Sequence, residues 1–334
     1  MSEFEKVISK ENEKNQATDE NGEKKSYGDV MKERRAKCAT LTAGAYLEIA
    51  DSSKKYRQML DAASNFTRNS PNNIMLIFAQ KPEATQLKSF EAWKEEGKFV
   101  KKGAQAAYIL VRKEYTDAKG EKRHSFDAEP RFDIADIKDA EPTPRKTYDE
   151  RLLMKGLIHG CPMRVVVDAN YPDDRNDGAY FDPQENIICC RYGMKIEEMF
   201  PSVAKAAAHA QMSGGDENYR VSEHEFDARS VAYILTKRYG VDASIVSIES
   251  IPDNFGDYEP DEFKGKIAEI LDVAKKIDGR ISEVLDRPIE KTRHKSLFKT
   301  EKVDRVSAFI TKHYKLWLVI FCVLLLPGIY GNNH

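Results

Sequence analysis

The sequence predicts an α+β protein with two domains and a C-terminal hydrophobic helix. Two observations predict the fold class: apolar residues recur every three or four positions around 56–66, and strand-type residues fill 107–115 before a turn. A third observation, a later series of one strand, one hairpin and four helical patterns, predicts the second domain. The 334 residues suffice for two domains, and 32% charged with 41% apolar residues is a soluble, globular balance.

The first 37 residues are predicted to be a disordered charged tail. They hold nine acidic and nine basic side chains and almost no large apolar ones. Such a segment cannot bury enough apolar surface to offset the entropy lost on ordering.

The first domain is expected over 38–140. Apolar residues from Tyr56 to Phe66 recur at three- and four-residue spacing, which predicts a helix. A short buried helix is expected over 72–80, and Pro71 suits a first helical position. A further helix is expected over 89–97 and a glycine-bearing turn at 100–103. Strands are predicted at 107–115, 122–126 and 131–137. The segment 139–146 is predicted to be a linker.

The second domain is expected over 147–290. It begins with a helix near 147–158, a buried strand at 163–168 and a hairpin over 178–190. Helices are predicted at 194–211 and 222–239, and apolar residues from Ile267 to Ile281 predict a long final helix.

The C-terminal segment 315–331 is a hydrophobic tail. Residues 316–330 carry no charge, follow several basic residues and have Trp317 and Tyr330 near their ends. This order predicts a short membrane anchor with the body of the protein in the cytoplasm, tethered to the inner face of the membrane. As a helix it would span about 22 Å, short of a ~30 Å hydrocarbon core, so a buried terminal helix is the alternative. Five irregularly spaced cysteines also favour a reducing cytoplasm.

A net charge of −2 excludes attraction of nucleic acid by the whole molecule. Residues 42–115, however, contain twelve Lys/Arg and eight Asp/Glu residues, and nine aromatic residues are interleaved with them. Cations that follow phosphates and rings that stack bases are the means by which proteins hold single-stranded nucleic acid.

The segment RNSPNNIMLIFAQKPEATQLKSFEAWKEEGKFVKKGAQAAYILV (68–111) resembles the N-terminal domain of ArdC-type antirestriction proteins, a module that recurs in LtrC-like proteins of conjugative elements. The resemblance implies binding of single-stranded DNA. Trp93 is predicted either to stack a base or to be structural. The DNA-contacting candidates are Lys54, Arg57, Arg68, Asn72, Asn73, Lys81, Trp93, Lys101 and Lys102.

The stretch VAKAAAHAQ (203–211) stands where a zinc peptidase would have His-Glu-x-x-His. That motif places two imidazoles on one helix face and a glutamate that activates zinc-bound water. Here the window reads Lys205-Ala206-Ala207-Ala208-His209. Lys205 replaces a ligand with a cation, and Ala206 removes the general base.

Downstream, residues 222–244 resemble the continuation seen in ArdC- and LtrC-type proteins and, more distantly, in ImmA/IrrE peptidases. That resemblance implies a zincin-like domain in which Glu225 occupies a ligand position. His209 and Glu225 are then remnants of a metal site, and no zinc or other cofactor is expected. Two alternatives stay open: recruitment of His224 as a third ligand, or His209 simply packed on an alanine-rich helix.

The expected function is that of a single-stranded DNA-binding accessory protein of a mobile, conjugative element. The second domain would be a pseudoenzyme that serves as a scaffold. The protein would also have partners in a DNA-transfer system, whose identity the sequence does not specify. The alternatives are a zinc metallopeptidase with unconventional ligands and a membrane-anchored interaction protein that does not bind DNA.

Overall fold

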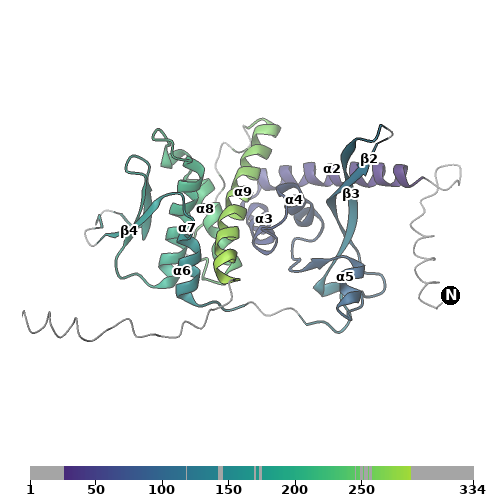
Figure 1. The fold of residues 1–334 in the computed structure, drawn as a ribbon, viewed down its shortest axis with the longest axis horizontal. Coiled ribbons are helices and arrows are strands. Elements are labelled where there is room, and N and C mark those ends of the chain that lie inside the picture. Colours follow the sequence, from purple (N-terminus) through teal and green to yellow (C-terminus); the bar gives the residue numbers. More distant parts are fainter. Residues whose placement is uncertain are drawn as a thin grey trace, which may run out of the picture. The chain divides into compact units, whose positions relative to one another are not determined.

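The computed structural model describes residues 26–117, 119–141, 146–168, 171–172, 175–244, 246–248, 251, 255 and 258–286. The hydrophobic tail at 315–331, expected to reach a membrane, lies outside the described residues. Within them, no helix combines the length and the apolar character that a membrane span requires. Helices and small sheets together make a mixed α+β structure, as the sequence predicts (Figure 1).

The N-terminal part contains three long helices, one short helix and a sheet. Its elements are α2 (Tyr27–Asp51), α3 (Ser53–Asn65), α4 (Pro71–Gln80), β1 (Leu87–Lys88), α5 (Phe90–Glu95), β2 (Ala107–Thr116), β3 (Lys122–Asp133) and the 3-10 turn η1 (Ile134–Asp136). Ser52, Ser70 and Ser89 cap the helices that follow them, each accepting a hydrogen bond from a backbone N–H in the first turn.

The prediction of a disordered tail over 1–37 is wrong for residues 27–37, which form the first part of α2. Ser26 caps this helix, and its buried stripe runs from Met31 through Cys38 and Thr42 to Ile49. The stripe consists largely of small or weakly apolar residues at three- to four-residue spacing, so it is inconspicuous beside the charges of the exposed face. Residues 1–25 lie outside the described part of the chain.

The first sheet has the order β1-β3-β2, with all neighbours antiparallel. Strands β2 and β3 form a long hairpin in which Leu110 pairs with Ala128. The two separate strands expected at 122–126 and 131–137 are instead one continuous strand that ends at Asp133. There Asp133 caps η1 and accepts from the backbone of Thr85 and Gln86.

The C-terminal part contains four helices, a second sheet and a 3-10 turn. Its elements are α6 (Glu150–Ile158), β4 (Arg164–Asp168), β5 (Ala179–Asp182), β6 (Ile187–Arg191), α7 (Ile196–Ser213), η2 (Val221–Glu223), α8 (Glu225–Arg238) and α9 (Pro260–Leu285). The sheet has the order β4-β6-β5, with β4 parallel to β6. The predicted β5–β6 hairpin is confirmed, and so are the helices α6 to α9.

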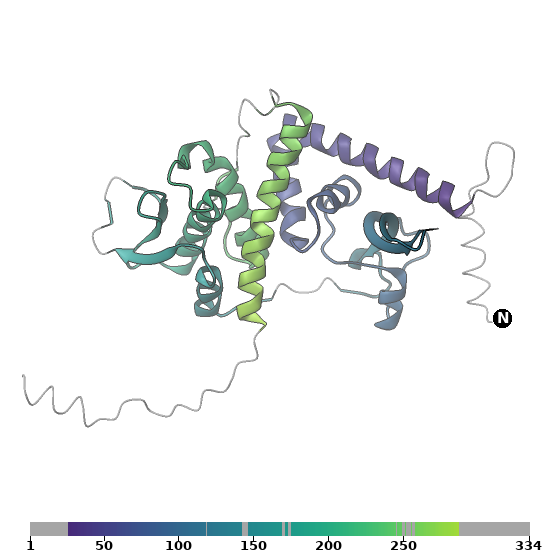
Figure 2. The ribbon, with the colours of Figure 1, turned by 45° about the horizontal axis from the view of Figure 1, so that its top comes forward.

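One large hydrophobic cluster draws residues from both sides of the expected linker. It includes Tyr56 and Ile74 from the N-terminal helices and Val231 and Ile277 from the C-terminal ones. Helix α9 packs on α6, α7 and α8 and also on α4 (Figures 1 and 2). The described residues up to Asp286 belong to one compact unit.

Candidate functional site

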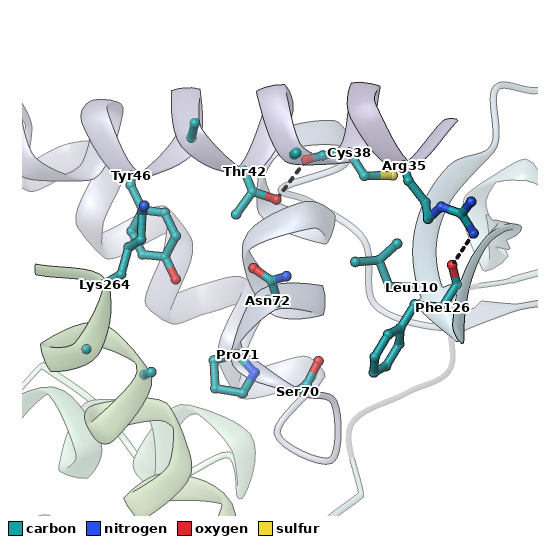
Figure 3. Close-up of a pocket in the computed structure, with 14 residues that line it drawn as sticks. Arg35, Cys38, Thr42, Tyr46, Ser70, Pro71, Asn72, Leu110, Phe126 and Lys264 are labelled. Atoms are coloured by element: carbon teal, nitrogen blue, oxygen red, sulfur yellow. Dashed lines mark hydrogen bonds between the residues drawn. The ribbon is translucent and has the colours of Figure 1, made fainter. Parts of the chain in front are cut away.

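A groove of about 650 Å³ lies beneath helix α2 and is the first candidate site. Its roof is one face of α2, from Arg35 to Tyr46. Its other walls are the start of α4, the β2–β3 hairpin and the start of α9. Figure 3 shows Arg35 beside Phe126 at one end, Tyr46 beside Lys264 at the other and Asn72 between them.

Local sequence explains why Asn72 reaches this groove. Ser70 caps α4 and Pro71 takes a position in its first turn, where a missing N–H costs nothing. Asn72 therefore lies in the first turn, next to backbone N–H groups that have no helical partner. Its side chain is exposed and lines the groove.

Two partly exposed cations mark the ends of the groove. Arg35 donates to the Phe126 carbonyl over 3.1 Å and pairs with Asp127 over 3.7 Å, and its side chain is 40% exposed. Lys264 pairs with Asp261 on its own helix, with Nζ and Oδ1 3.1 Å apart and its side chain 45% exposed. Arg35 and Tyr46 are eleven residues apart on α2, or about 16 Å along the axis. Both cations thus remain accessible to a further anion.

The rings of the groove differ in what they can contact. Phe126 is 52% exposed, so its face can stack on a base. Tyr46 is buried and packs edge-on against Phe263, with ring centroids 6.2 Å apart. Sequence reasoning missed Arg35, Phe126 and Lys264. The basic run at 32–37 was the available signal for Arg35, but it was assigned to the disordered tail.

Two predicted DNA contacts are excluded by burial. Trp93 is fully buried, and its Nε1 donates to the Phe132 carbonyl over 2.9 Å, so no base can stack on it; the structural alternative holds. Asn73 is also buried. Its side-chain amide donates to the Leu110 carbonyl over 2.9 Å and accepts from the Leu110 N–H over 2.8 Å. The amide of Asn73 is therefore buried and bonded to the backbone at the edge of β2, so it cannot contact DNA.

Three predicted cations gather around or near η1. Lys81 pairs with Asp136 and is largely buried, so its charge is already satisfied. Lys101 is exposed, and its Nζ donates to the Ala135 carbonyl over 2.9 Å. Lys102, on the same glycine-bearing turn, is exposed. Lys101 and Lys102 thus form a second small basic surface that does not line the groove.

The remaining predicted cations contact other elements. Arg57 on α3 donates to the Ile248 carbonyl over 2.9 Å, and Lys54 is exposed one turn before it. Arg68 lies 3.7 Å from Asp286, and both side chains are largely exposed. Of the predicted DNA contacts, the structure brings Asn72 alone into the groove.

The second candidate site joins α7 to α8 at the stretch 203–211, which was compared above with a zinc-peptidase motif. Lys205 and His209 lie one turn apart on α7 and both reach Glu225, the first residue of α8. Lys205 Nζ donates to Glu225 Oε1 over 3.0 Å, and His209 Nε2 lies 3.1 Å from Oε2. The sequence therefore identified three side chains that do converge.

Further groups complete this cluster. Tyr219 Oη lies 2.9 Å from His209 Nδ1, Arg229 Nη2 lies 3.2 Å from Glu225 Oε1, and Asp177 Oδ2 lies 3.6 Å from Lys205 Nζ. Burial acts to raise the pKa of Glu225, but hydrogen bonds from His209 and Lys205 outweigh it and lower the pKa to about 2. The carboxylate is therefore ionised at neutral pH and carries the compensating charge for its cations.

The donor set does not fit a zinc centre. Among the described residues, no group of three or more His, Cys, Asp and Glu side chains is arranged to hold a metal ion. The ammonium of Lys205 occupies one oxygen of Glu225, and His209 occupies the other. His224 contacts Asp227 over 3.4 Å and stacks on Tyr219, with ring centroids 4.8 Å apart. A protonated lysine donates hydrogen bonds and cannot be a ligand.

Two crystal structures of the antirestriction ArdC protein from the R388 plasmid are similar to this chain. The metal-free one has a TM-score of 0.39 and 15% identity, covering 65% of this chain and 85% of that chain. The Mn(II)-bound one has a TM-score of 0.44 and 13% identity, covering 72% of this chain and 98% of that chain.

No curated protein matches the sequence significantly. Residues 40–155 match the family model for the N-terminal domain of anti-restriction factor ArdC. The matched residues include α3, α4, the first sheet and the C-terminal half of α2. Over these residues, about a third of its length, the chain is similar to the N-terminal domain of the ArdC-type proteins.

Proposed function

We propose that the protein binds single-stranded DNA in the groove beneath α2 and acts as an antirestriction accessory protein of a mobile, conjugative element. The observation that carries the proposal is the groove itself. Accessible cations stand at both of its ends, an exposed ring lies beside one of them, and an exposed amide lies between them. The ring of Phe126 and the amide of Asn72 belong to the segment that matches the ArdC N-terminal domain, whereas the two cations lie outside it.

The groove suits an unpaired strand for physical reasons. Phosphates would pair with Arg35 and Lys264, and the first turn of α4 would offer Asn72 and backbone N–H groups to a phosphate between them. A base would stack on Phe126. None of these contacts reads a base edge, so little sequence preference is expected.

The second half of the chain would then act as a scaffold without peptidase activity, because Lys205 and Ala206 replace a ligand and the general base. The body of the protein would lie in the cytoplasm. Residues 316–330 would tether it to the membrane, where protein partners of a DNA-transfer system would meet it.

Binding can be measured by fluorescence anisotropy with a labelled 20-nucleotide oligo(dT), titrated with the full chain at 50 to 200 mM salt. We expect affinity to fall steeply with salt. An Arg35→Ala, Lys264→Ala double variant should bind about tenfold more weakly and reduce the salt slope by about 1.4, at ~0.7 per lost phosphate contact. Phe126→Ala should also lose about tenfold in affinity, with the slope unchanged.

The matched control is a Lys155→Ala, Lys195→Ala double variant, which removes two exposed lysines outside the groove. It should bind as the parent does. Absent or salt-insensitive binding would refute DNA binding altogether. If Lys101→Ala, Lys102→Ala abolished binding while the groove variants retained it, the groove assignment would be wrong and the turn near η1 would be the interface.

A further inference from the structure

Two side chains of α7 hold the two oxygens of a single carboxylate. Lys205 and His209 are four residues apart, so they project from one face of the helix. Lys205 Nζ and Glu225 Oε1 are 3.0 Å apart, and His209 Nε2 and Glu225 Oε2 are 3.1 Å apart. Lys205 thus occupies the position that the first histidine of a His-Glu-x-x-His helix would have. Its positive charge lies against Glu225, the carboxylate at the predicted ligand position.

The rest of a metal site is already organised around this charge. His209 is 2% exposed, and Tyr219 Oη contacts its Nδ1 over 2.9 Å, which fixes the ring and directs Nε2 toward Glu225. Such an outer partner is what normally orients an imidazole toward a metal. Asp177 Oδ2, 3.6 Å from Lys205 Nζ, adds a second carboxylate at the edge of a cleft of about 540 Å³.

We propose that the Lys205 ammonium is a resident cation that takes the place of a divalent metal ion between α7 and α8, and that Lys205→Ala or Lys205→Met opens the site while Lys205→His converts it to a zinc site. The inference is independent of DNA binding in the groove. It rests on the contacts that Lys205, His209 and Glu225 make with one another.

The physical reason lies in charge and in ligand number. Two partly buried carboxylate oxygens next to an imidazole favour a compensating cation, and an ammonium supplies it as part of the chain. An incoming metal ion would meet the positive charge of the lysine and find two protein ligands, fewer than the three or four that zinc sites use. An imidazole at position 205 would remove the charge and raise the ligand number to three.

The test uses the full chain and metal alone. Parent, K205H, K205R and K205M proteins are dialysed against Zn²⁺ and then against metal-free buffer, and retained zinc is measured by mass spectrometry. We expect about one zinc per chain for K205H and well under a tenth for the parent and K205R. K205M lacks both the charge and the third ligand, and it should retain less zinc than K205H.

Thermal unfolding gives a second readout that does not depend on activity. Zn²⁺ at hundredfold excess over its Kd should raise the melting temperature of K205H by about 5 °C and leave the parent unchanged. If K205H is unfolded without metal, refolding in Zn²⁺ should restore its circular-dichroism spectrum. The proposal is overturned if the parent retains stoichiometric zinc or manganese, or if K205H neither binds Zn²⁺ nor refolds with it.

Discussion

Neighbouring asparagines in the first turn of α4 have opposite roles. Asn73 is buried, and its side-chain amide forms two hydrogen bonds with the backbone of Leu110. Gln80, two turns later, contacts Tyr108 in the same way: its amide donates to the Tyr108 carbonyl and accepts from the Tyr108 N–H, each over 2.9 Å. These amides satisfy the outer edge of β2, which would otherwise present unpaired backbone groups. Asn72 is exposed and lines the groove. Identical side chains therefore serve stability at one position and, as we propose, binding at the next.

Alanine substitutions separate these roles. Asn73→Ala leaves the buried N–H and carbonyl of Leu110 without their partner, and we expect it to lower the free energy of unfolding by about 2 kcal/mol. Asn72→Ala should change it by less than about 0.5 kcal/mol but weaken binding of oligo(dT). Urea unfolding and anisotropy on both variants provide the check. Equal losses of stability would contradict the assignment.

Glu225 makes stability depend on acid pH. Its pKa of about 2 in the folded state lies below the ordinary value of 4.5. Its contribution is therefore fully present above about pH 4.5 and is lost as the pH falls toward 2. We expect the stability difference between the parent and Glu225→Gln to be about 1 kcal/mol smaller at pH 3.5 than at pH 5.5. Urea unfolding at the two pH values measures it, and a difference that does not shrink with acid would refute it.

At the scale of elements, close approach of helices depends on small residues. Helices α6 and α9 meet at Gly156, where a Cβ atom would lie 3.0 Å from the Cα of Ile281. The alanine-rich face of α7 is likewise buried, with Ala204, Ala206, Ala207 and Ala208 nearly inaccessible. This packing explains why residues that look featureless in the sequence lie in the core.

Gly156→Ala should force α6 away from α9 and lower the free energy of unfolding by about 1–3 kcal/mol. Gly279 is the matched control, since it lies inside α9 and a Cβ there would meet no atom within 4 Å. Gly279→Ala should be neutral or raise stability by up to about 1 kcal/mol, because alanine favours helix. Thermal unfolding of the two variants distinguishes them, and a stable Gly156→Ala protein would show that the helices can separate freely.

At the scale of the whole molecule, the two sequence halves share their interior. Tyr56 on α3 donates to Ser230 on α8 over 2.9 Å, and Thr67 donates to the buried Asp278 of α9 over 2.8 Å. Asp278 also accepts from Tyr239 over 2.6 Å and pairs with Arg238. Segments about two hundred residues apart thus depend on the same buried groups, which favours cooperative unfolding of both halves.

Ile277→Ala tests this cooperativity. Ile277 is fully buried in α9, so the substitution should cost about 2–5 kcal/mol. We expect hydrogen exchange measured by mass spectrometry to accelerate equally in peptides from α3, α4, α7 and α8. Faster exchange confined to α7 and α8 would instead support two independent domains with a boundary near 140–147.

Several features follow from the sequence alone because their causes are local. Serine caps, Pro71 and the apolar spacing define α3, α4 and α5, and strand composition with a turn defines the β2–β3 hairpin. The sequence alone also shows Lys205 and Ala206 at the positions where a zinc-peptidase motif would have a histidine and a glutamate. Helix α2 was missed because its buried face is weakly apolar and its exposed face is highly charged.

Only the tertiary structure decided which side chains are free to act. In the folded chain Trp93 and Asn73 are buried, and Lys81 pairs with Asp136. The residues that line one groove together are Arg35, Asn72, Phe126 and Lys264. The tertiary structure also set the ammonium of Lys205 on Glu225. These outcomes depend on contacts between residues far apart in the chain, whose partners no local pattern specifies, whereas helix caps and apolar periodicity are contained within a few successive residues.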